Sequence, residues 1–295
     1  MYSERGAASG VSPNRVRALS RLLRAARLLL LYCGLVVGLL LFCVPTYYMV
    51  TTSFKDESEV FAIPIHWLPH VFRPDNYPAA FRVAPFGLYF VNSAFVALSV
   101  VLLTLFFCAL CGYGLSKYQF PGRDIIFYFI LSTMMIPFQV IIIPLYVLVY
   151  KLGWTNTYAG LIIPGSVSAF GVFLMRQFLI TVPDELMDAA RMDGAGEFAI
   201  FWRVVVPLLR PPLATLAILT FIGSWNDFLW PLLVVSKNKL FTLPLGMTVF
   251  TQPLRQPYWT YIMAVSTVAT LPVLAVFVSL QRYFIQGVVL SGMKG

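Results

Sequence analysis

Few residues in this chain combine in a pattern that could carry chemistry. His66 and His70 are spaced i, i+4, which would suit a metal ion only on a continuous helix, and Pro69 between them argues against one. Cys108 and Cys111 form a C-x-x-C, but two thiols without a second pair or a nearby His make a poor metal site. We therefore predict no metal site and no catalytic residue, which speaks against a membrane-embedded enzyme.

A single acid, Asp227, lies well inside a long apolar run. It is flanked by Trp225, Asn226 and Trp230 in the stretch "SWNDFLW". An ionisable group at membrane depth is costly and normally faces a polar cavity or a polar partner. Asp227 is therefore a candidate for a functional position.

A second candidate is the polar stretch "PDELMDAARMDGAGEF", residues 183–198, which lies between two apolar runs and has five acidic residues out of sixteen. Pro183 can open a helix, because the backbone donor it lacks would be unpaired there, and acids in the first turn favour the same start. We expect this helix to run through Met192 and to stop at Gly194 or Gly196 in a left-handed turn. The apolar stretch that follows predicts a second helix. A solvated amphipathic loop is the simpler alternative.

These candidates must be positioned by membrane-spanning helices. Of the 295 residues, 59% are hydrophobic and 11% charged, whereas a soluble chain carries roughly 25% charged residues. Runs of about 18 or more apolar residues are long enough to cross a bilayer. The runs do not alternate as the strands of a membrane barrel would. We predict an all-α integral membrane protein with six transmembrane helices at Leu28–Val50, Leu88–Cys111, Ile125–Val149, Tyr158–Met175, Leu213–Val235 and Tyr261–Gln281.

The distribution of basic residues predicts the orientation. Five arginines at positions 15–27 precede the first span, and basic residues beside a span stay cytoplasmic. With six spans, both termini and the 116–124 and 176–212 segments are then inside, and the inside segments hold 14 of the 21 Lys and Arg residues. The net charge of +9 therefore reports topology and contact with anionic lipid, and we expect no nucleic-acid partner.

We divide the chain into three parts: a basic cytoplasmic N-terminal tail (1–27), the transmembrane domain (28–286) with its polar loop at 181–212, and a cytoplasmic C-terminal tail (287–295). The composition of the first 14 residues predicts disorder. Prolines within the predicted spans predict interruptions, at Pro137, Pro144, Pro164 and Pro272.

The string "DAARMDGAG", with Phe201, Pro207 and Pro211 downstream, resembles the coupling-loop signature of bacterial ATP-binding-cassette importer permeases. Four further stretches resemble the carbohydrate-importer branch of that family, similar to the second permease of the maltose system. They are "PLYVLVYKLGWTNTYAGLIIP" (144–164), "FLMRQFLITVPDELMDAARMDGAG" (173–196), "WNDFLWPLLV" (225–234) and the terminal "GMKG". The resemblance covers nearly the whole chain from about residue 28.

The resemblance implies that the short helix between helices 4 and 5 is a cytoplasmic coupling helix. It would dock on a separate ATPase and transmit ATP-driven closure to the spans through the 183–211 loop. Asp188 stands where the family usually has Glu, which keeps the charge and shortens the reach by one methylene. The residues expected to serve this coupling are Glu185, Asp188, Ala189, Ala190, Asp193, Gly194, Ala195, Phe201 and Pro207.

The resemblance also implies a sugar or oligosaccharide as cargo. Sugars are bound by hydrogen bonds and aromatic faces, so Trp225, Asn226 and Asp227 could line the substrate path. The WN-x-F pattern recurs across this branch whatever the cargo, which favours a gate or a helix-packing role instead. The sequence does not say which sugar is carried.

The chain lacks a G-x-x-x-x-G-K-[ST] loop for binding ATP phosphates, so we expect it to bind no cofactor and to perform no catalysis itself. ATP and Mg²⁺ would be bound by two partner ATPase subunits. A second homologous permease and an extracytoplasmic substrate-binding protein complete the implied assembly in a bacterial inner membrane. The rival is an ion-gradient-driven secondary transporter, which would show internal repeats and paired ionisable groups at the midplane.

Overall fold

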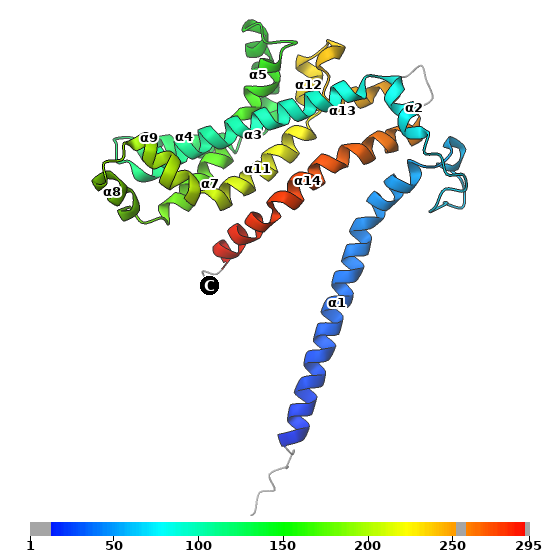
Figure 1. Cartoon of the computed structure of the whole chain (residues 1–295), viewed down its shortest axis with the longest axis horizontal. Helices are drawn as coiled ribbons and strands as arrows, with labels where there is room; N and C mark the ends of the chain where they lie inside the picture. The colour runs from blue at the N-terminus through cyan, green and yellow to red at the C-terminus, as the bar shows by residue number, and fades with distance from the viewer. Residues whose placement is uncertain (1–12, 252–257, 293–295) are drawn as a thin grey trace, which may run out of the picture.

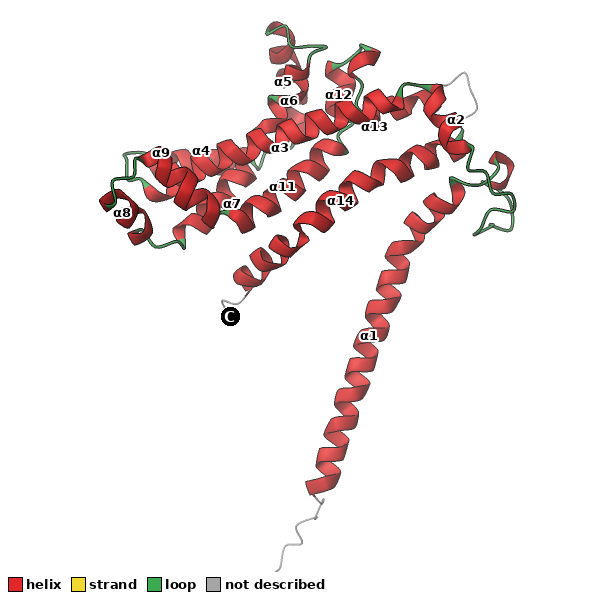
Figure 2. Ribbon diagram, in the orientation of Figure 1, coloured by secondary structure: helices red, strands yellow, loops and turns green. Residues whose placement is uncertain are grey.

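The computed structural model describes residues 13–251 and 258–292, and every regular element in these ranges is helical (Figure 2). The prediction of an all-α protein is confirmed. The terminal "GMKG" and the first twelve residues lie largely or wholly outside the described residues. The elements are α1 Pro13–Thr52, η1 Glu57–Glu59, α2 Asn76–Val83, α3 Phe86–Lys117, α4 Arg123–Thr133, α5 Phe138–Lys151, α6 Tyr158–Ile162, η2 Pro164–Ser166, α7 Ala169–Ile180, α8 Glu185–Met192, α9 Glu197–Ile200, η3 Phe201–Val205, α10 Val206–Leu208, α11 Arg210–Trp225, α12 Leu229–Val234, η4 Asn238–Leu240, α13 Leu243–Gly246, η5 Met247–Thr251 and α14 Trp259–Gly292.

Within the described ranges, three helices are each long and apolar enough to cross a membrane: α1, α3 and α14. Three further pairs qualify only when their two parts are taken together. The pair α4 and α5 is bent by 102°, α6–η2 and α7 by 41°, and the segment from α9 to α10 and α11 by 77°. The count of six spans therefore depends on each bent pair crossing the bilayer as one unit.

The expected helix over Ile125–Val149 is corrected to two helices. α4 ends at Thr133, and α5 begins after Pro137, whose φ of −60° and ψ of 138° leave the helical region. Proline has no N–H to continue the hydrogen-bond ladder, so the break falls there. Pro144 and Pro272, by contrast, lie inside α5 and α14 without ending either helix.

The expected span at Leu213–Val235 is also corrected. α11 ends at Trp225, residues 226–228 form a break, and the short α12 follows. Helices extend into both predicted tails: α1 begins at Pro13, and α14 continues to Gly292.

α3 is the central helix of the bundle, and α7, α11 and α14 lie beside it or beside one another (Figure 1). Small residues allow this close packing. A Cβ added to Gly112 of α3 would lie 2.5 Å from the Met175 Cβ of α7, and one added to Gly171 would lie 2.5 Å from the Cys108 sulfur. Cys108 is buried there and acts as a packing residue.

The segment between α1 and α3 is fastened to the start of α14. The carboxylate of Glu57 accepts hydrogen bonds from the backbone N–H groups of Trp259 (2.8 Å) and Thr260 (3.1 Å) and from the Thr260 hydroxyl (2.7 Å). The carboxylate thereby satisfies backbone N–H groups at the start of α14 that have no partner within the helix. α1 itself diverges from the bundle, and its most apolar window has no residue buried in the chain (Figure 1).

Candidate functional site: the α8–α9 loop

The polar stretch singled out from the sequence forms α8, a tight turn and α9, at one end of the long axis of the molecule (Figure 1). α8 is anchored by one buried side chain, Met187, which is 2% exposed. Met187 belongs to a core cluster with Ile200, Phe201 and Val205 from the following segment and residues of α3 and α7. The helix is therefore seated on the bundle along one face only.

The turn after α8 is a Schellman motif. Gly194 has a φ of +81°, the left-handed conformation that glycine adopts without strain. Its N–H donates to the Arg191 carbonyl at 2.9 Å, and the Ala195 N–H donates to the Ala190 carbonyl at 3.0 Å. The expected left-handed stop at Gly194 is confirmed, and α8 ends at Met192 as predicted.

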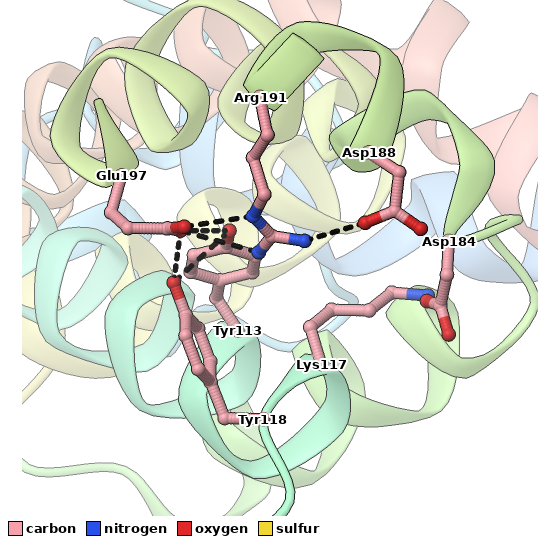
Figure 3. Close-up of polar contacts among 7 residues, drawn as sticks. All are labelled: Tyr113, Lys117, Tyr118, Asp184, Asp188, Arg191 and Glu197. Atoms are coloured by element: carbon pink, nitrogen blue, oxygen red, sulfur yellow. Dashed lines mark hydrogen bonds and ion pairs between the residues drawn. The ribbon is translucent and has the colours of Figure 1, made fainter. Parts of the chain in front are cut away.

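A charged network holds α8 against α9 and the end of α3 (Figure 3). Arg191 donates from Nε to Glu197 Oε1 at 2.8 Å and from Nη1 to Asp188 Oδ1 at 2.7 Å. The same Glu197 carboxylate accepts hydrogen bonds from the hydroxyls of Tyr118 and Tyr113. The hydrogen bonds to Glu197 and then Asp188 raise the pKa of Arg191, so its guanidinium stays charged.

A second contact ties the start of α8 to α3. Lys117 Nζ lies 2.5 Å from Asp184 Oδ1 and donates to the Val182 carbonyl. The Lys117 side chain is 5% exposed, whereas that of Asp184 is 72% exposed. Figure 3 shows Lys117 reaching from the end of α3 toward Asp184 at the base of α8. Both ends of the loop are thus connected to one helix of the bundle.

The opposite face of α8 is open. Glu185, Asp188 and Asp193 are exposed, as is Ala189. Met192 is 88% exposed, an unusual setting for a large apolar side chain. Ala190 and Ala195, in contrast, are half-buried against the core cluster of this chain. Of the three alanines expected to serve the coupling, Ala189 is therefore the one on the open side.

Phe201 and Pro207 lie in the helical segment that follows. Phe201 is buried and packs beside the Tyr113 ring, with centroids 5.8 Å apart. It begins a π-helical turn, in which the Val206 N–H donates to the Phe201 carbonyl. Pro207 comes directly after this turn, where the donor it lacks would continue the ladder. The sequence analysis did not anticipate this π-turn, although π-turns inside helices often mark functional sites.

The second group of predicted residues lies away from the loop, at the other end of α11. Trp225 is buried, and its Nε1 donates to the Ala269 carbonyl of α14 at 3.1 Å. Asn226 is exposed and donates to the Ile222 carbonyl. Asp227 lines a cavity of about 360 Å³. The structure therefore brings the loop residues together and keeps these three apart from them.

Sequence reasoning missed Tyr113, Lys117 and Tyr118, which supply the bundle side of both contacts. They form the end of α3 and the residue after it, in the string "YGLSKY". The signal was available: these are polar groups at the boundary of a long apolar helix, on the side expected to hold the loop. Their spacing in the sequence, however, does not predict their partners. Asp184 lies 67 residues after Lys117, and Glu197 lies 79 residues after Tyr118.

The long apolar helices and the exposed polar loop between them are features of an integral membrane protein. The model of the family described as binding-protein-dependent transport system inner membrane component matches residues 106–289. The chain belongs to this family and is therefore a multi-pass inner membrane component of a transport system. This assignment gives no support to an ion-gradient-driven carrier.

Similar proteins cover most of the chain. The arabinooligosaccharides transport system permease protein AraQ of Halalkalibacterium halodurans is 39% identical over 256 residues, which are 85% of this chain and 91% of that protein. The sn-glycerol-3-phosphate transport system permease protein UgpE of Yersinia enterocolitica is 34% identical over 262 residues, 86% and 93% of the two chains. Both relatives are described as permease proteins of transport systems.

A solved structure shares the fold. It is the crystal structure of a bacterial ABC transporter involved in the import of the acidic polysaccharide alginate, and it matches with a TM-score of 0.78 at 25% sequence identity. The match covers 88% of this chain and 98% of that chain.

Proposed function

We propose that this chain is the permease subunit of an ATP-driven importer of a sugar or related solute, and that the 183–211 loop transmits the closure of a partner ATPase to the spans. The observation that carries this proposal is the seating of α8. One face is anchored through Met187 and tied to α3, while the other exposes acids and a large apolar side chain. α8 therefore exposes one face to a partner protein, while its other face is held to α3.

The chemistry of the open face suits a cleft on another protein. Glu185 and Asp188 offer carboxylates, and Met192 offers a flexible apolar side chain that adapts to irregular surfaces. A push on α8 would reach α3 by two routes: through Lys117 at the start of the helix and through the Arg191–Glu197–Tyr118 contacts at its end. Two points of attachment resist both tilting and sliding.

The proposal extends to the assembly. ATP and Mg²⁺ would be bound by two ATPase subunits, and this chain would bind no cofactor. An extracytoplasmic binding protein, which the family description supports, and a second permease would complete the importer. Both termini and the 181–212 loop would lie in the cytoplasm, with residues 28–286 forming the transmembrane domain. Oligosaccharide and glycerol phosphate relatives support a sugar or sugar-like cargo.

Co-purification tests the coupling role. The tagged chain is expressed with its second permease and ATPase, and the retained ATPase is compared for wild type, Asp188→Lys, Met192→Glu and Gly194→Pro. We expect all three variants to lose ATPase while the two permeases stay paired. Asp75→Lys is the matched control, because Asp75 is exposed but precedes α2, away from α8. Undiminished ATPase in the three variants would contradict the docking role of α8.

A further inference from the structure

The cavity beside Asp227 has a lining with a distinct chemical character. It lies among α3, α5, α6, η2, α7, α11 and α12, and it is lined by hydroxyls, one carboxylate and three aromatic side chains. Thr220 and Ser224 lie on one face of α11 at i, i+4, and Asp227 lies in the break between α11 and α12. Among the described residues that line the cavity, none is Lys, Arg or His.

Three lining hydroxyls, those of Thr220, Ser224 and Thr242, make no hydrogen bond among the described residues. Thr242 is 3% exposed, and its Oγ1 is buried without a hydrogen bond. Two other lining hydroxyls already make hydrogen bonds within the chain. Thr104 donates to the Ser166 carbonyl, and Ser168 accepts from the Gly171 N–H. The Thr242 Oγ1 is closed to the cavity by its burial. The hydroxyls of Thr220 and Ser224, which line the cavity and are half-buried, are therefore the ones that a solute can reach.

Asp227 also keeps capacity for a ligand. Its Oδ1 accepts a hydrogen bond from the Trp230 N–H at 3.3 Å, which orients the carboxylate at the start of α12. An ionised carboxylate has two oxygens and about four acceptor sites. The rings of Phe138 and Trp230 form part of the same wall, with centroids 6.3 Å apart and planes at 74°. They present apolar surface beside the polar groups.

We propose that this cavity is a binding site on the solute path for a neutral, hydroxyl-rich solute, and that it disfavours anionic ones. The proposal rests on the importer function proposed above and adds the class of cargo. Hydroxyls of a neutral sugar donate to Asp227 and exchange hydrogen bonds with Thr220, while the C–H faces of its ring pack on Phe138 and Trp230. A phosphate or uronate group meets a carboxylate with no cation beside it, and like charges repel strongly at low dielectric.

Ligand protection of an engineered cysteine tests this proposal. Ser224→Cys is introduced, the assembled complex is purified, and a small methanethiosulfonate reagent labels it while mass spectrometry follows residue 224. The probes are a neutral pentose oligosaccharide and sn-glycerol 3-phosphate at equal concentration. We expect the oligosaccharide to slow labelling and the phosphate ester to leave it unchanged. Thr220→Val, which keeps the shape, should weaken the protection by about three- to tenfold.

Asp227→Asn separates charge from shape. In that background, glycerol phosphate should begin to slow the labelling of residue 224. Equal protection by both probes in the wild-type background would overturn the proposal, and so would no protection by the oligosaccharide. Labelling that responds only to removal of lipid would assign the cavity to an acyl chain and overturn it as well. A wild-type complex that retained no ATPase would refute the coupling function but leave these labelling results interpretable.

Discussion

Arg191 Nε donates to Glu197 Oε1 at 2.8 Å across the turn that reverses the chain between α8 and α9. The two residues lie on either side of Gly194, so the ion pair spans the Schellman turn and fixes the angle between the helices. Glu197 also accepts the hydroxyls of Tyr113 and Tyr118. One carboxylate therefore joins three segments: the exposed helix, the helix after the turn and the end of α3.

Glu197→Gln should uncouple ATP hydrolysis from solute uptake. The amide keeps the shape but loses the charge-assisted bonds, so α8 would shift without moving α3 to the same extent. In proteoliposomes containing the full complex, we expect about a tenfold lower ratio of solute transported to ATP hydrolysed, the size of effect that the loss of a strong polar contact produces. Arg73→Gln is the control, because it breaks a surface ion pair with Asp56 far from the loop. An unchanged ratio in Glu197→Gln would remove this contact from the coupling path.

Lys117→Met should destabilise the contact between α3 and α8. The nearly buried ammonium bonds both Asp184 and the Val182 carbonyl, and the apolar side chain leaves both acceptors without it. Hydrogen bonds to charged groups contribute about 1–3 kcal/mol, so we expect a melting temperature several degrees lower in detergent. The double variant with Asp184→Ala should lose less than the sum of the two single variants. Strict additivity would show that the two residues do not interact.

Gly112→Ala should destabilise the bundle although it adds one methyl group. The new Cβ would lie 2.5 Å from the Met175 Cβ, and overpacking of a tight interface costs about 1–3 kcal/mol. Gly114→Ala is a matched control on the same helix, because its Cβ would meet nothing within 4 Å. Thermal unfolding of the two variants should therefore differ, with the control at or above wild type. Equal melting temperatures would mean that α3 and α7 can move apart freely.

Acid should release the contact made by Glu59 in the segment between α1 and α3. The hydrogen bond from the His70 backbone N–H, with a second from Val71, holds the pKa of Glu59 below its usual value. A lowered pKa in the folded state means that the contribution to stability is present above the unfolded pKa and is lost as pH falls through the folded pKa. Protection factors for hydrogen exchange at residues 70 and 71 should fall over that acidic range. Glu59→Gln should lack the transition, and an identical profile in that variant would assign it to another group.

The sequence predicted local features better than long-range ones. Gly194 and the end of α8 followed from backbone preferences that act within a few residues. Apolar composition located the membrane segments, but it did not reveal the 102° bend between α4 and α5 or the break after Trp225. Inside a hydrophobic run every face is apolar, so periodicity carries little information about direction or packing. The contacts of Lys117 and Glu197 depend on tertiary arrangement and could not be read from spacing.

The unbroken length of α3 has a thermodynamic consequence. Val96, Val100 and Thr104 line the cavity, and Tyr113 and Lys117 hold the α8–α9 loop, all on one 32-residue helix. If occupancy of the cavity shifts this helix, the affinity for the docked partner must change by some factor. Linkage then requires that docking change the affinity for the solute by the same factor. In such a permease, bound solute changes the affinity for the ATPase, and docked ATPase changes the affinity for the solute. Either affinity can therefore be used to detect whether the other partner is bound.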